Sequence, residues 1–162
     1  MSKNMAYSGL LLALNIVLLI LSFVIPTNTL FFMGLASLPI SIVIIEQGIK
    51  WGIVFYIASS ILSFLFMPDK LNWITYIFTF GLYGIIKYYI ERDRNIFIEY
   101  ILKLATFNII IAIGYFFIKE FINIPLNIIT VLLAQVIFFI YDYSYSLAIN
   151  YYYEKIRKNI IK

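Results

Sequence analysis

Long apolar segments separated by short polar ones make up most of this chain. The first, residues 6–25, carries no charged side chain and would be about 30 Å long as a helix, which matches the hydrocarbon core of a bilayer. Further apolar segments cover residues 30–46, 51–67, 71–88, 100–118 and 126–145. This pattern predicts an all-α integral membrane protein, one domain over residues 1–162 that forms a bundle of six transmembrane helices.

Two of these segments admit a second interpretation. The first begins after Lys3, as a signal peptide would, but its apolar run is longer than a signal core and lacks a small-x-small cleavage site before Pro26. These features favour a retained helix. The second, residues 30–45, is short and contains Pro39, so a kinked or re-entrant segment is the alternative to a full crossing. Its length, with the polar residues at its ends, favours crossing.

The charged residues predict the orientation. The stretch 87–103 holds seven of the twenty charged side chains, so we expect it to be a central water-facing loop. With six spans, ten Lys and Arg residues lie on the side of this loop and two, Lys70 and Lys119, on the other. Because basic residues beside spans collect in the cytoplasm, both termini are predicted to be cytoplasmic in a multi-pass protein of the bacterial cell membrane. A five-span arrangement, in which residues 30–45 do not cross, places nine Lys and Arg residues on one side and three on the other. The charge distribution therefore scarcely separates the five-span and six-span arrangements.

Composition removes several classes of function. The chain is 64% hydrophobic and 19% aromatic and has no His or Cys, so it lacks an imidazole base, a thiol nucleophile and the usual metal ligands. It has no G-x-x-x-x-G-K-[ST] loop, so ATP-driven work would need another chain. We therefore expect neither enzymatic activity nor a cofactor or metal. The net charge of +4 follows from the predicted topology and indicates no nucleic-acid partner.

Asp142 is the one acid inside a predicted span. An intramembrane carboxylate is a functional candidate, and a membrane enzyme that uses Asp142 is the least favoured function. Because Asp142 lies near the cytoplasmic end of its span, within reach of Lys87 or Lys103, we favour an ion pair.

Three amides lie near mid-depth on separate predicted helices: Asn15, Asn108 and Gln135. An amide that faces lipid leaves its donors and acceptors unpaired, so we expect these side chains to face the bundle interior. Hydrogen bonds between helices and substrate binding explain them equally well.

A second polar group lies toward the predicted outer surface, on the last three spans and their ends. It consists of Asn72, Trp73, Tyr76, Tyr115, Asn123 and Asn127. Aromatic walls with amide donors are typical of a small-molecule site, so with Asn108 and Gln135 these are the candidate substrate-binding residues. The alternative for each is an interfacial aromatic belt with ordinary turn asparagines.

Small residues share one face of the first predicted helix. Ala6, Gly9 and Ala13 fall at helical spacing, and Gly9-x-x-x-Ala13 lets another helix approach closely. This face serves either internal packing or the docking of a separate protein. At the other end of the chain, the basic tail with its run of tyrosines, residues 151–153, is consistent with an interfacial anchor on anionic lipid.

Three stretches resemble a known family. They are MAYSGLLLALNIVLLIL at residues 5–21, ASLPISIVIIEQGIKWGI at 36–53 with Pro39, Gly48 and Gly52, and FGLYGII at 80–86 with Gly81 and Gly84. Together they resemble the substrate-binding S components of energy-coupling-factor transporters and their uncharacterised relatives. The resemblance covers about the first ninety residues, and beyond the central loop it extends only to size and topology.

The resemblance implies a six-helix protein with both termini inside that captures a vitamin or similar micronutrient in an outward-facing pocket. It also implies that an Ala-x-x-x-Ala face of the first helix docks on a transmembrane coupling subunit served by two ATPases. Gly9 and Ala13 occupy the corresponding positions, with Gly in place of the first Ala. Only Asp69 and Glu120 carry negative charge on the predicted outer side, so a neutral or weakly charged, flat ligand fits best.

The alternative function is a non-transport membrane scaffold in cell-wall morphogenesis or sporulation. Such a protein recruits cell-wall enzymes, binds no small molecule and has a partner with its own spans.

Overall fold

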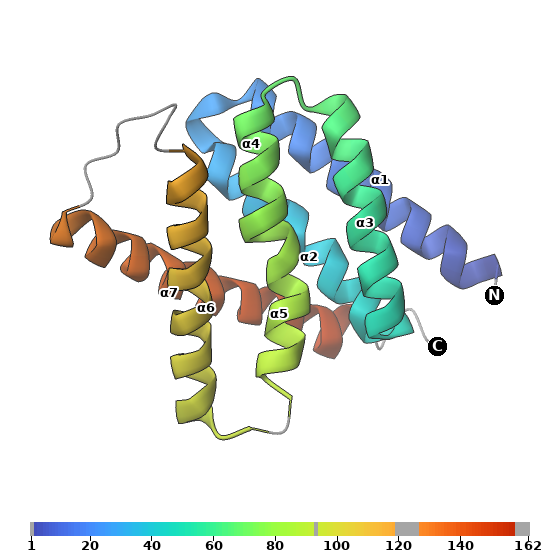
Figure 1. The fold of residues 1–162 in the computed structure, drawn as a ribbon. Helices are drawn as coiled ribbons and strands as arrows, with labels where there is room; N and C mark the ends of the chain where they lie inside the picture. The colour runs from blue at the N-terminus through green and yellow to red at the C-terminus, as the bar shows by residue number, and fades with distance from the viewer. Residues whose placement is uncertain (1, 93, 119–126, 158–162) are drawn as a thin grey trace. The chain divides into compact units, whose positions relative to one another are not determined.

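A computed structural model describes residues 2–92, 94–118 and 127–157, and all regular elements of these ranges are helical (Figure 1). The α-helices are α1 (Ser2–Val24), α2 (Thr29–Gln47), α3 (Ile49–Phe66), α4 (Lys70–Thr75), α5 (Leu82–Ile90), α6 (Ile96–Ile118) and α7 (Ile128–Tyr151). A 3₁₀ turn, Pro26–Asn28, precedes α2, and π-helical segments follow α4 (Tyr76–Gly81) and α7 (Tyr152–Ile156). The all-α prediction is confirmed for the described residues.

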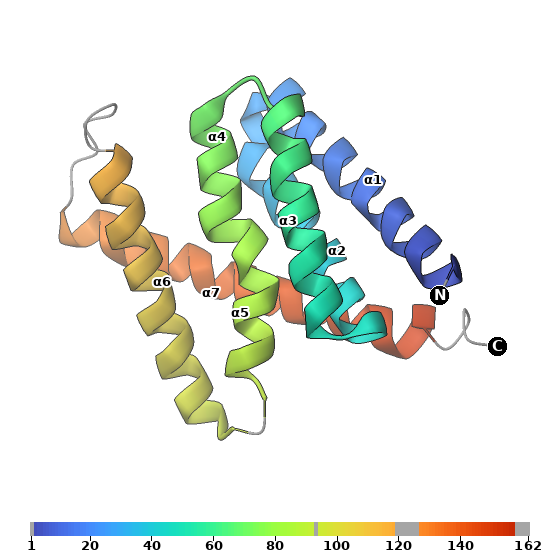
Figure 2. The same ribbon diagram turned by 45° about the vertical axis from the view of Figure 1, so that its right-hand side comes forward.

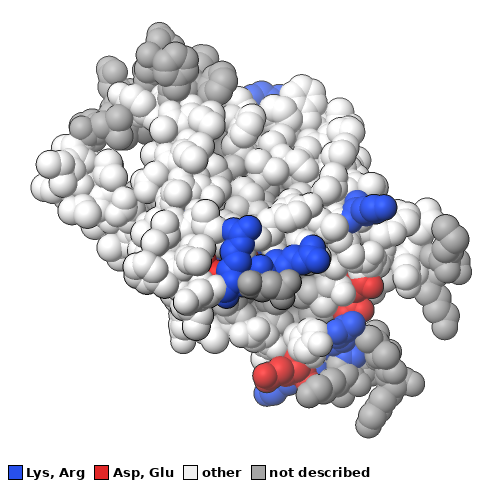
Figure 3. Space-filling model, turned by 60° about the horizontal axis from the view of Figure 1, so that its bottom comes forward, with Lys and Arg blue, Asp and Glu red and all other residues white. Residues whose placement is uncertain are grey.

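Five helical stretches among the described residues are long and apolar enough to cross a membrane. They are Asn4–Val24, Pro26–Gln47, Ile49–Phe66, Ile96–Tyr115 and Ile128–Ile156. The surface in Figure 3 fits this character, because charged side chains occupy only a small part of it. These features support a membrane-embedded protein. The crossing predicted at residues 71–88 consists of α4, a π-helical segment and α5, so six crossings and cytoplasmic termini stay predictions.

The second apolar segment is longer than its sequence indicates. The helix α2 continues without a break through Pro39, and with the preceding 3₁₀ turn it gives a candidate span of 22 residues, Pro26–Gln47. The predicted span, residues 30–46, included Glu46 but left out residues 26–29, among them the polar Thr27 and Asn28. The helix is therefore long enough for the full crossing that we favoured.

The chain divides into two compact units, residues 1–89 and 90–162. The amino-terminal unit contains α1 to α4, the π-helical segment after α4 and nearly all of α5, whereas the carboxy-terminal unit contains α6 and α7. The single domain over residues 1–162 stays a prediction.

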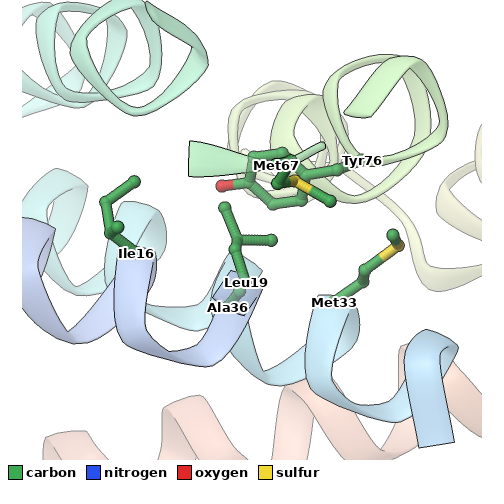
Figure 4. Close-up of a cluster of buried hydrophobic side chains, with 6 residues drawn as sticks. All are labelled: Ile16, Leu19, Met33, Ala36, Met67 and Tyr76. Carbon is green, nitrogen blue, oxygen red and sulfur yellow. The ribbon is translucent and has the colours of Figure 1, made fainter. Parts of the chain in front are cut away.

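Helix α2 is the centre of the amino-terminal unit. It packs against α1, α3 and the π-helical segment Tyr76–Gly81, as both ribbon views show (Figures 1 and 2). Half of its candidate span is buried, more than in any other candidate span. One apolar core cluster joins Ile16 and Leu19 of α1, Met33 and Ala36 of α2, Met67 and Tyr76 (Figure 4). The packing of α1, α2 and α3 thus positions the polar side chains of these helices that point into this core.

Two glycines allow the tight hairpin between α2 and α3. Gly48 ends α2 with a φ of 89°, a left-handed conformation that favours glycine. A Cβ on Gly52 would lie only 2.2 Å from Cγ1 of Ile44, so a larger residue fits there only if the Ile44 side chain or the helices shift. Both glycines belong to the stretches that carry the family resemblance. The geometry of the hairpin between α2 and α3 explains why glycine suits each position.

Replacing Gly52 by Ala is expected to lower the free energy of unfolding by about 1–2 kcal/mol, because the added methyl overlaps Ile44 in a packed interface. SDS titration of the purified protein in mixed micelles measures this loss. Gly9→Ala is the matched control, since its Cβ would meet no atom within 4 Å and Ala favours helix over Gly. An equal loss for the two variants would contradict the packing argument.

Candidate functional site

A closed ring of hydrogen bonds lies in the core of the amino-terminal unit. Asn15 Nδ2 donates to the Tyr76 hydroxyl at 2.8 Å, and Ser59 Oγ donates to Asn15 Oδ1 at 2.7 Å. The Ser59 and Tyr76 hydroxyls lie 2.9 Å apart, and because Ser59 gives its hydrogen to Asn15, Tyr76 is the donor of this third bond. The second N–H of Asn15 donates to the Ala36 carbonyl. All three side chains are fully buried.

The ring joins α1, α2, α3 and the π-helical segment at one point. Each hydroxyl donates once and accepts once, and both N–H groups of Asn15 are used. Asn15 therefore faces the bundle interior, as expected, and makes the hydrogen bonds between helices that were one of its two explanations. Ser59 is a member that the sequence did not reveal. Other serines of α3, such as Ser60 and Ser63, bond to carbonyls of their own helix, so no local signal tells which serine bonds to a different helix.

Tyr76 begins the π-helical segment, which lies against α3. A Cβ on Gly81, at the end of the segment, would lie 3.0 Å from the Tyr56 ring, so glycine permits this close approach. The Tyr56 hydroxyl lies 3.4 Å from the Ile77 carbonyl of the segment. A π-helical turn within an otherwise α-helical run often marks a functional site. Here it carries the candidate substrate residue Tyr76, whose hydroxyl is held by Asn15 and Ser59.

The turn between α3 and α4 is closed by side-chain caps. Asp69 Oδ1 accepts from the Leu71 N–H at 2.9 Å, and its Oδ2 accepts from Asn72 Nδ2 at 2.8 Å. Lys70 Nζ donates to the carbonyls of Phe64 and Met67, at the end of α3, at 2.6 and 3.0 Å. A carboxylate at the start of one helix and an ammonium at the end of another both suit the helix dipoles.

Trp73 packs onto the last turns of α3. Its Nε1 donates to the Ser60 carbonyl at 3.1 Å, and its ring meets Phe64 edge to face with centroids 4.9 Å apart. Asn72, Trp73 and Tyr76 thus lie on one helical run, and each makes a hydrogen bond within the amino-terminal unit.

A lysine binds two carboxylates in the carboxy-terminal unit. Lys103 Nζ of α6 lies 3.0 Å from Asp142 Oδ2 of α7 and 2.6 Å from Glu91 Oε1. The side chains of Lys103 and Asp142 are each only 7% exposed, whereas that of Glu91 is 35% exposed. The ion pair predicted for Asp142 is confirmed, with Lys103 as its partner. Glu91 was not foreseen, because its charged neighbourhood indicated only a water-facing loop.

Contacts between α6 and α7 continue from this ion pair. The rings of Phe107 and Phe138 stack with centroids 4.2 Å apart, and Gln135 Nε2 lies 3.4 Å from Asn108 Oδ1. The amides of Asn108 and Gln135 therefore pair between helices. In the structure Asn108 is exposed and Gln135 half-buried, in contrast to the fully buried Asn15.

The remaining candidate substrate residues are scattered. Asn127 caps α7, since its Oδ1 accepts from the Thr130 N–H at 2.8 Å. Tyr115 is half-buried near the end of α6. Asn123 lies outside the described residues. The structure thus brings together Asn72, Trp73 and Tyr76 in one unit and Asn108 with Gln135 in the other.

The small face of α1 is open. Ala6, Gly9 and Ala13 are all exposed, and a Cβ on Gly9 would meet no atom within 4 Å. The opposite side of α1 packs instead, through buried residues such as Leu11 and Leu19. Internal packing within the amino-terminal unit therefore does not use this face.

Comparison with known protein families, with curated proteins and with solved structures finds no match for this chain. Its function is therefore inferred from the chemistry of its own residues.

Proposed function

We propose that this chain is the substrate-capture subunit of a primary uptake transporter, similar to the S components of energy-coupling-factor transporters. In this proposal it takes up a vitamin or similar small micronutrient across the bacterial cytoplasmic membrane. A separate transmembrane coupling subunit and two ATPases supply the energy, since the sequence has no phosphate-binding loop of its own.

The exposed small face of α1 carries this proposal. A helix side lined by Ala6, Gly9 and Ala13 permits another transmembrane helix to approach closely, and in lipid such close packing is a main source of helix association. The open space at Gly9 means that this face is available to a partner. It coincides with the positions that the family resemblance assigns to docking.

Trp substitutions on this face are expected to abolish docking. Gly9→Trp and Ala13→Trp should each leave the free energy of unfolding within about 0.5 kcal/mol, because both sites are exposed, yet prevent close helix approach. The tagged variants are purified from native membranes, and the co-purified coupling subunit and paired ATPases are quantified by mass spectrometry. We expect at least a tenfold loss of these subunits relative to the unmodified chain.

Leu14→Trp is the matched control, since Leu14 is also exposed on α1 but lies on a different side of the helix. It should retain the partner subunits. Recovery of the unmodified chain as a clean monomer, from cells that express the coupling subunit and ATPases, would contradict the proposal. So would equal recovery from all three Trp variants.

A membrane scaffold is the second candidate, and hydrogen bonds within the chain favour it. The Tyr76 hydroxyl is bound to Asn15 and Ser59. Asn72 Nδ2 donates to Asp69, and Asn127 Oδ1 accepts from Thr130, so these atoms are already used within the chain. Native mass spectrometry of gently extracted protein separates the two functions. A retained molecule in the mass range of a vitamin supports capture, whereas a partner with its own spans and no small ligand supports the scaffold.

A further inference from the structure

Helix α7 and the π-helical segment after it are together longer than the hydrocarbon core of a membrane is thick. Their candidate span, Ile128–Ile156, has 29 residues and would extend about 43 Å at 1.5 Å per residue. The hydrocarbon core of a bilayer is only about 30 Å thick. If Ile128 lies at one boundary of the core, the other boundary falls near residue 148. Residues 151–157 then lie about 5–14 Å beyond it, in the headgroup layer.

Two exposed tyrosines, each paired with a cation, occupy this end of the helix; Lys155 is exposed and Arg157 is half-buried. Lys155 Nζ lies 5.2 Å from the centroid of the exposed Tyr151 ring, and the Arg157 guanidinium lies 5.0 Å from that of the exposed Tyr153 ring. Tyrosine rings prefer the membrane–water interface, and a cation over a ring is held there by the ring's quadrupole. The two tyrosine rings therefore hold the positive charges of Lys155 and Arg157 in the layer of the membrane that contains the lipid phosphates.

We propose that this end of the helix is a binding site for anionic phospholipid, in which the Tyr151–Lys155 pair holds one headgroup and the Tyr153–Arg157 pair, on the opposite side of the helix, holds another. Charge complementarity identifies the ligand, because the phosphate of such a lipid accepts hydrogen bonds from the ammonium and guanidinium groups. Glu154 is the one acid in residues 151–157, and two more lysines, at positions 158 and 162, follow in the sequence. The site does not depend on the transport proposal, nor on the side of the membrane that this end occupies.

Lipid retention tests the site. The full chain is placed in nanodiscs that contain equal amounts of phosphatidylcholine and phosphatidylglycerol, and the lipids that stay bound are identified by native mass spectrometry. The unmodified chain should retain phosphatidylglycerol in preference. The double variant Lys155→Gln, Arg157→Gln should lose about 25-fold in this preference, since each of the two basic residues near an anionic surface contributes about fivefold. Added salt should weaken the preference of the unmodified chain.

Matched controls separate this site from general charge effects. The swap Lys155→Arg, Arg157→Lys keeps both charges and should retain the lipid, while Lys50→Gln removes an exposed cation elsewhere and should change nothing. The proposal is overturned if the Gln double variant retains phosphatidylglycerol as the unmodified chain does, or if Lys50→Gln loses it equally. Inorganic phosphate that displaces the lipid at millimolar concentration would show a general anion site, and would overturn the assignment to lipid.

Discussion

Replacing Lys103 by Met is expected to lower the free energy of unfolding by about 3–5 kcal/mol, the usual loss when one partner of a buried ion pair is removed. Lys103 binds both Asp142 and Glu91, and the Asp142 side chain is only 7% exposed. Without the ammonium group, two negative charges remain close together, one of them buried. SDS titration in mixed micelles, or steric trapping in bicelles, measures the loss.

A second substitution should reverse part of this effect. In Lys103→Met, Asp142→Leu the buried carboxylate is gone as well, and Glu91 is exposed enough to be hydrated. We therefore expect the double variant to be more stable than Lys103→Met alone. The control Lys50→Met removes an exposed lysine and should cost less than about 0.5 kcal/mol. If the double variant is no more stable than Lys103→Met, the pairing with Asp142 contributes nothing.

Replacing Asn15 by Leu should cost about 2–4 kcal/mol. The variant loses the bonds to Ala36, Ser59 and Tyr76, and a hydrogen bond between helices in a membrane contributes about 0.6–1.7 kcal/mol. The Ser59 and Tyr76 hydroxyls, both buried, are also left without an amide partner. Unfolding in SDS, followed by the circular dichroism signal, gives the loss in stability.

Asn108→Leu is the matched control for Asn15→Leu, because it is the same substitution at an exposed amide whose contact with Gln135 is 3.4 Å long. It should cost less than about 0.6 kcal/mol. A double-mutant cycle of Asn15→Leu with Tyr76→Phe should show a coupling energy of at least about 0.5 kcal/mol. Equal losses at positions 15 and 108 would count against the importance of the buried ring.

The sequence predicted most helices because apolar length and charge placement are local signals. It did not predict the π-helical segment Tyr76–Gly81, since nothing in that stretch separates a wide turn from an α-turn. The second span was underestimated mainly at its start, because the predicted segment began at residue 30, although polar residues such as Thr27 and Asn28 are tolerated at the end of a span.

In the candidate site, the sequence predicted the surroundings of polar side chains that are removed from water. Asn15 had to face inward because an amide in lipid is costly, and Asp142 had to find a cation for the same reason. For Asp142 the position in its span limited the partner to Lys87 or Lys103, and Lys103 is the one that binds it. The partners of Asn15 depend on how distant segments pack, because Ser59 and Tyr76 follow it by 44 and 61 residues, so no local pattern in the chain reveals them.

The ring formed by Asn15, Ser59 and Tyr76 has an electrical consequence. Its donors all point the same way round, so the bond dipoles run head to tail around a circle and their vector sum nearly vanishes. A group of polar atoms with little net dipole exerts only a weak field on its apolar surroundings, where an uncompensated dipole would be costly. The amide fixes the direction of circulation, because only its nitrogen can donate and only its oxygen can accept. The amino-terminal unit can therefore hold these three polar side chains in its apolar core at a low electrostatic cost.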